Sequence, residues 1–285
     1  MSRLVQFPSR QNGLSLVELM VGLALGLVLM VGVLQVFLAS RQTYASNDAM
    51  ARLQENGRFG LEFIASSARL AGYTDPRARL EKGLSIPPLA GTNCDNQTGF
   101  TGTNTGACSS NGNGNSSDSL AIALQPPLTD GVRRDCLGNT VDENEVIINH
   151  FEIIPPNNNT PAALGCRAWN ITKDDWNTGS AGGAQPLVEG IDSLQVLYGI
   201  DDAGGTSRSP TRYVSADTVT AGNNWPNVLA VRIAVLANSV ASLSPAPQNR
   251  HYVLLDSAPL AAADLGNDNR ARQIFSTTIQ LKNAN

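Results

Sequence analysis

Six residues near the N-terminus, Gly13-Leu-Ser-Leu-Val-Glu18, place a small residue, where a peptidase could cut, five positions before a single carboxylate. They follow a short leader containing Arg3 and Arg10, and they precede an apolar run from Leu19 to Ala39. An ordinary secretory signal has its small-residue cleavage site after the apolar stretch. Here the small residue comes first, so a cut after Gly13 would remove residues 1–13 and keep the apolar segment as an anchor.

This arrangement resembles the signal of type IV prepilins. The resemblance implies that a membrane-embedded prepilin peptidase cuts between Gly13 and Leu14 and methylates the new amine of Leu14. It also implies that Glu18 pairs with the methylated amine of an adjacent pilin and sets the register during assembly, since a carboxylate near the membrane is costly without a partner. In the alternatives, Glu18 only complements the dipole at the start of a helix, or the segment is a plain anchor in which Gly13 and Glu18 are accidental.

Composition and charge limit the classes of partner. The chain has 285 residues and a net charge of −4. Without the leader, 18 basic and 24 acidic residues would remain, a net charge of −6. This balance argues against a general binder of nucleic acid or anionic membranes, and no direct nucleic-acid binding is predicted. Charged residues make up only 15% of the chain, as expected for a loop-rich domain outside the cytoplasm.

Four cysteines follow the anchor: Cys94, Cys108, Cys136 and Cys166. The arginines of the leader favour an N-terminus on the cytoplasmic side, which would place all four cysteines in an oxidising compartment. An even count there predicts two disulfides. Of the three possible connectivities we favour Cys94–Cys108 and Cys136–Cys166, each joining neighbours in sequence and each stabilising by about 3 kcal/mol. Zinc is the alternative, but the chain has no C-x-x-C pair, and no metal or cofactor is predicted.

The anchor begins a long predicted helix over residues 14–72, because residues 14–71 contain no proline and Gly72 and Pro76 supply a stop. Its first half, Leu19–Ala39, has 21 residues and is long enough to cross a bilayer. Its second half is amphipathic. The predicted apolar face consists of Ala49, Leu53, Gly57, Gly60, Ile64, Ala68 and Ala71, widened by Phe59 and Phe63. The opposite side carries Glu55, Arg58, Glu62 and Arg69, with ion-pair spacing for Glu55–Arg58 and Arg58–Glu62.

Residues 73–285 alternate β-prone runs with turn-rich spacers, which predicts a globular β-rich domain in the periplasm. The amphipathic half-helix would pack on its sheet, so the predicted fold class is α+β, with a long N-terminal helix on a C-terminal antiparallel sheet. The predicted strands are Ser119–Leu124, Val146–Ile154, Gly165–Ile171, Ile191–Ile200, Val228–Ala237, His251–Leu255 and Arg272–Leu281.

No catalytic motif is present. The two histidines, His150 and His251, are isolated, and the chain has no H-E-x-x-H, G-x-S-x-G or phosphate-binding loop. His150 falls within a predicted strand, where a structural role is favoured. Asp201-Asp202 before two glycines could supply oxygen ligands, but a solvated turn is favoured. The sequence therefore predicts no enzyme.

Internal segments narrow the resemblance to PilW-type minor pilins of the type IV pilin and pseudopilin superfamily. The resembling segments are Arg52–Phe59, Leu70–Tyr73, Asp135–Asn139, Leu187–Ile191, Val196–Ile200 and Arg272–Asn283. The resemblance implies an inner-membrane protein that joins other minor pilins and the major pilin through its helix, starts pilus assembly and lies near the tip. A minor pseudopilin of a type II secretion system and a membrane-tethered adhesin that never polymerises are the alternatives.

Overall fold

The computed structural model describes residues 13, 15–76, 89–90, 108–112, 116–157, 160–177, 183–201, 209–244, 250–261, 263–266 and 268–283. The chain divides into two compact units, Met1–Asn47 and Asp48–Asn285. Leu14 and Cys94 lie outside the described residues.

The first element is the α-helix α1, Leu16–Arg69. It ends about where the sequence predicts, because Gly72 adopts a positive φ of 73° that other residues rarely take. The N–H of Gly72 donates to the carbonyl of Ala123 at 2.8 Å. The end of the helix is thus joined to the first sheet of the second unit.

The first sheet has the strand order β1-β2-β5-β6-β7, with β8 also paired to β6, and all its pairs are antiparallel. Its strands are β1 (Leu89–Ala90), β2 (Leu120–Leu124), β5 (Ile147–Ile154), β6 (Ala163–Asn170), β7 (Asp175–Trp176) and β8 (Gln185–Glu189). A separate hairpin joins β3 (Arg133–Arg134) to β4 (Thr140–Val141).

The second sheet has the order β10-β9-β11-β12 and is also antiparallel throughout. Its strands are β9 (Ile191–Ile200), β10 (Arg212–Val214), β11 (Val228–Asn238) and β12 (Arg272–Gln280). The helix α3 (Ala216–Ala221) and the 3-10 turn η2 (Trp225–Asn227) connect β10 to β11. Single residue Gly190 separates β8 from β9, so the chain passes directly from one sheet to the other.

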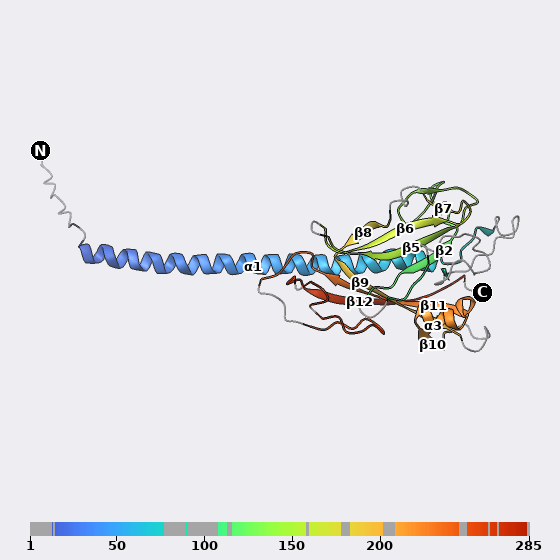
Figure 1. Ribbon diagram of the computed structural model, residues 1–285. Coiled ribbons are helices and arrows are strands. Elements are labelled where there is room, and N and C mark those ends of the chain that lie inside the picture. Colours follow the sequence, from blue (N-terminus) through green and yellow to red (C-terminus); the bar gives the residue numbers. More distant parts are fainter. Residues whose placement is uncertain are drawn as a thin grey trace, which may run out of the picture. The chain divides into compact units, whose positions relative to one another are not determined.

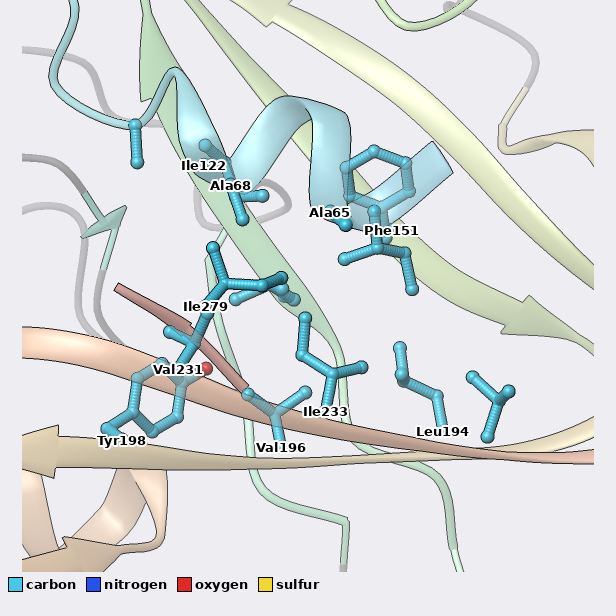
Figure 2. Packing of buried hydrophobic residues seen from close by; sticks show 14 of the residues in the cluster. Ala65, Ala68, Ile122, Phe151, Leu194, Val196, Tyr198, Val231, Ile233 and Ile279 are labelled. Atoms are coloured by element: carbon cyan, nitrogen blue, oxygen red, sulfur yellow. The ribbon is translucent and has the colours of Figure 1, made fainter. Parts of the chain in front are cut away.

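The two sheets share one core with the second half of α1, which runs between them (Figure 1). Every residue of the predicted apolar face, from Ala49 to Ala71, is buried. Figure 2 shows Ala65 and Ala68 of the helix facing side chains of both sheets, among them Phe151 of β5 and Val231 of β11. The sequence predicts that this half-helix packs on one sheet. In the structure it packs on two sheets, because both of its flanks bury small or branched side chains.

The exposed side of this half-helix differs from the prediction. Phe59 and Phe63 are 51% and 43% exposed, so they do not widen the buried face. Glu62 pairs with Arg69 at 2.8 Å, and neither predicted pair through Arg58 forms.

Six of the seven predicted strands are present, Ile191–Ile200 with the predicted ends and the others with ends shifted by at most two residues. The seventh, His251–Leu255, forms only a single bridge between Tyr252 and Leu260, and Leu255 has a φ of 51°. Its Leu254 packs with Leu236 on the outer face of the second sheet. The apolar run is buried by covering a sheet, not by joining one. The five-residue β8 was not predicted; it contains Pro186 and a register shift, as expected of a strand that pairs on one side only.

Candidate functional site

The start of α1 is a capping box built by Ser15 and Glu18. The Glu18 carboxylate accepts a hydrogen bond from the Ser15 N–H at 3.1 Å, and the Ser15 hydroxyl accepts one from the Val17 N–H at 3.4 Å. Each side chain thereby satisfies a backbone donor that the first helical turn leaves without a partner. Among the residues that the structure describes, no basic side chain pairs with Glu18, so its charge is compensated only by the helix terminus.

Gly13 is exposed and precedes the helix by three residues. Gly13, the residue on the N-terminal side of the predicted cut, therefore lies outside regular secondary structure, as a peptidase substrate requires. A cut there would leave a new amine one residue before Ser15, whose N–H already contacts Glu18. The predicted cleavage and methylation at Leu14 and the assembly role of Glu18 remain predictions.

The first half of the helix that follows is apolar, and none of the described residues of the chain packs against it. The most apolar 18 residues of α1 have a mean hydropathy of 2.5, and none of them is buried. The helix is long and apolar enough to cross a membrane. Its large side chains, from Leu16 at 75% to Phe37 at 50%, are exposed on all sides. A helix that is apolar all round needs lipid or other apolar helices around it. Within this unit, a Cβ added at Gly22 or Gly26 would meet nothing within 4 Å, so packing within the unit does not explain these glycines.

A disulfide joins Cys136, in the turn after β3, to Cys166 of β6, with their Cα atoms 6.5 Å apart. This confirms one of the two predicted pairs. The preceding residue, Asp135, shapes the turn: one carboxylate oxygen accepts from the N–H groups of Leu137 and Asn139, each at 2.9 Å. The Asp135–Asn139 motif is therefore structural. Cys108 is not a free thiol, but Cys94 lies outside the described residues, so the predicted Cys94–Cys108 pair stays a prediction.

His150, a candidate for chemistry, is buried and neutral. Its Nε2 lies 3.1 Å from the Cys108 carbonyl, and Arg167 lies 3.5 Å from its Nδ1. Since Arg167 can only donate, Nδ1 accepts and Nε2 carries the proton. Burial, followed by the charge of Arg167, lowers the pKa of His150 to about 4. Both ring nitrogens have partners within the fold, which supports the structural role predicted from its strand position.

Asp118 and Asp192 are two largely buried carboxylates that were not identified from the sequence. Asp118 is 3% exposed and accepts from the N–H groups of Gly112 and Val196, each at 2.7 Å; burial raises its pKa to about 6. Asp192 binds Arg272 at 2.7 Å. Neither carboxylate belongs to a sequence motif, and only the fold brings their partners together. In the described part of the chain, no group of three His, Cys, Asp or Glu side chains could hold a metal ion.

The processing motif, the apolar helix that follows it and the helix-on-sheet domain together define a type IV pilin-like protein. Residues 8–34 match the family model of the prokaryotic N-terminal methylation motif, and residues 153–283 match that of the type IV pilus-assembly protein W. The two matches support a PilW-type minor pilin of type IV pili.

One further likeness is more distant. A type IV-like pilin from Thermus thermophilus aligns with a TM-score of 0.42 and 15% sequence identity, over 82% of this chain and 99% of that one. At these values the likeness does not bear on function. No curated protein matches the chain.

Proposed function

We propose that this minor pilin primes assembly of a type IV pilus, lies at the pilus tip, and so supports twitching motility and adhesion. The observation that carries the proposal is the Gly13–Glu18 motif at the head of an uncovered apolar helix, in a chain of the PilW family. The domain after this helix has its own core and a disulfide, as expected of a globular domain carried outside the cell.

The physical mechanism starts in the bacterial inner membrane, where lipid covers the apolar part of α1 before assembly. Prepilin peptidase removes residues 1–13 and methylates Leu14. The helix then exchanges lipid for the helices of other minor pilins and of the major pilin. Close approach at Gly22 and Gly26 is possible because nothing in their own unit occupies the space beside them.

Glu18 acts during this exchange. In the isolated chain its carboxylate is held by the Ser15 N–H, a neutral donor that offsets little of the cost of a charge near lipid. The methylated amine of a neighbouring pilin supplies the opposite charge, which makes one position of the incoming helix more favourable than positions shifted along its axis. Glu18 therefore selects the register of the subunit.

The experiment compares Glu18→Ala with Glu55→Ala, which removes an exposed carboxylate from the same helix. Glu18→Ala should be processed and inserted like the wild type but should be depleted from sheared pili, because the charge pair is lost. Glu55→Ala should incorporate normally. Immunoblots of membranes and of purified pili measure both. Normal incorporation of Glu18→Ala would remove the pairing role.

The two alternatives differ in partners. A minor pseudopilin would co-purify with type II secretion components, and a tethered adhesin with neither secretion components nor pilins. The match of residues 153–283 to a pilus-assembly family favours the pilus. We propose no catalytic activity, no cofactor and no direct contact with nucleic acid.

A further inference from the structure

The strand β12 is a long open edge of the second sheet. It has nine residues and pairs with β11 on one side only. Its register with β11 is continuous from Arg272 to Gln280, without a bulge. Ser276 and Thr278 are exposed.

Three hydrogen bonds show which backbone groups of β12 face this edge. The Leu281 N–H donates to the Leu229 carbonyl at 2.8 Å, and the Ser239 N–H donates to the Ala271 carbonyl at 2.9 Å. In an antiparallel pair such bonds recur at every second residue, so the odd-numbered residues of β12 bond to β11. Consistently, Asn238 of β11 donates in the opposite direction, to Gly190 next to β9, at 2.7 Å.

The even-numbered residues Ile274, Ser276 and Thr278 therefore direct their N–H and C=O groups away from β11. Within the described part of the chain these groups have no hydrogen-bond partner. These outward N–H and C=O groups recur at every second residue. An extended partner strand presents its own donors and acceptors at the same interval, so it could pair with them.

Open edges are normally protected by short length, proline, bulges or exposed charge. The other outer strands show such protection: β1 and β7 have two residues each and β10 has three, while β8 has Pro186 and a register shift. β12 has no proline and no bulge. Its single charge, Arg272, is held by Asp192 and Asp268 and is not available at the edge.

We propose that the open edge of β12 binds an extended strand of a neighbouring pilin of a different type. This inference rests on the proposed function. β12 lies alongside the second half of α1: Phe275 packs against Gly57, and Asn283 donates to the Ala71 carbonyl at 3.0 Å. Pilins that assemble by packing their helices side by side bring their globular domains together laterally. Because the edge of β12 runs beside the helix, it faces such a neighbouring domain. The exposed Ser276 and Thr278 suit an uncharged partner strand.

The test uses Ser276→Pro and its control Ser276→Ala in the full chain, co-expressed with the other pilins of its system. Proline at position 276 removes an outward N–H and leaves the β11–β12 bonds intact, which is the position that a strand tolerates. Recovery of the Ser276→Pro chain in the detergent-extracted pilin complex should fall about tenfold or more, while Ser276→Ala should match the wild type. Resistance to proteolysis checks the fold of each variant.

A second variant, Ser276→Lys, keeps the backbone N–H and the fold, and blocks the edge with an exposed charge; it should also lose the complex. Wild-type recovery for a folded Ser276→Pro or Ser276→Lys chain overturns the proposal. Self-association of the purified wild-type chain that Ser276→Pro abolishes assigns the edge to a second copy and also overturns it. If the wild-type chain itself lacks N-methyl-Leu14 and pilin partners, the proposed function fails; if both are present and the variants have no effect, only the edge proposal fails.

Discussion

Arg272 shows how one buried side chain can hold together segments that are distant in sequence. Its Nε lies 2.7 Å from Asp192 of β9, and its two terminal nitrogens each lie 2.8 Å from Asp268 in the loop before β12. The side chain of Arg272 is only 6% exposed. Asn238 of β11 also donates to Asp192, at 2.7 Å, so a single cluster links β9, β11 and the loop before β12.

Arg272→Ala should lower the free energy of unfolding by about 3–5 kcal/mol, because it leaves the largely buried carboxylate of Asp192 without its cation. Arg69→Ala is the matched control: its ion pair with Glu62 is exposed, and exposed pairs contribute little. Urea unfolding of the full chain in detergent, followed by tryptophan fluorescence, measures both. Equal effects of the two substitutions would contradict the role of the cluster.

Asp118 and His150 make opposite contributions to the pH dependence of stability. Asp118 has a pKa raised from 3.8 to about 6 in the folded chain, so it contributes stability at low pH that is lost as pH rises through about 4 to 6. His150 has a pKa lowered from 6.5 to about 4, so its contribution is present above pH 6.5 and is lost as pH falls toward 4. Between about pH 4 and 6 the two effects oppose each other.

Asp118→Asn should therefore make the protein more sensitive to acid. Its free energy of unfolding should fall by up to about 1.4 kcal/mol per pH unit between about pH 6 and 4, because only the His150 contribution remains. His150→Gln should show the reverse slope, with stability rising as pH falls through the same window. Urea titrations at several pH values test the pair, and identical pH profiles for both variants and the wild type would contradict the account.

At the scale of elements, the contact between α1 and β12 depends on a missing side chain. A Cβ at Gly57 would overlap the ring of Phe275, whereas a Cβ at Gly60 would lie 3.3 Å from the terminal methyl of Ile191. The first contact involves a ring close to its own backbone, and the second a flexible tip. Gly57 thus sets how closely the helix approaches the second sheet.

Gly57→Ala should destabilise the head domain by about 1–3 kcal/mol, since overpacking outweighs the better helix propensity of alanine. Gly60→Ala should stay within about 1 kcal/mol of the wild type, because Ile191 can move aside. Thermal unfolding monitored by tryptophan fluorescence gives the comparison. A Gly57→Ala chain as stable as Gly60→Ala would contradict the close approach.

The elements that the sequence predicts well are those with a strong period. The buried face from Ala49 to Ala71 repeats at helical spacing, and β12 alternates as a strand with one buried face does, whereas β11 is buried on both faces. His251–Leu255 has the composition of a strand but covers a sheet, since apolar character does not specify the backbone partner. The division into two sheets and the Arg272 cluster could not be predicted, because both depend on contacts between segments far apart in the chain.

At the scale of the whole molecule, the two units meet different requirements. The unit Met1–Asn47 contains an apolar helix with no cover of its own, whereas the unit Asp48–Asn285 has a closed core and a disulfide. The apolar helix of such a protein has to be surrounded by membrane lipid or by a bundle of similar helices. The N-terminal methylation motif that residues 8–34 match favours a pilin over a permanent membrane protein.

Mass spectrometry of the mature N-terminus tests this central claim most directly. Protein isolated from cells that contain prepilin peptidase should begin with N-methyl-leucine at Leu14, and the same protein from cells lacking the peptidase should keep residues 1–13. A mature chain that begins at Met1 in both strains, or beyond Ala39, would contradict the account.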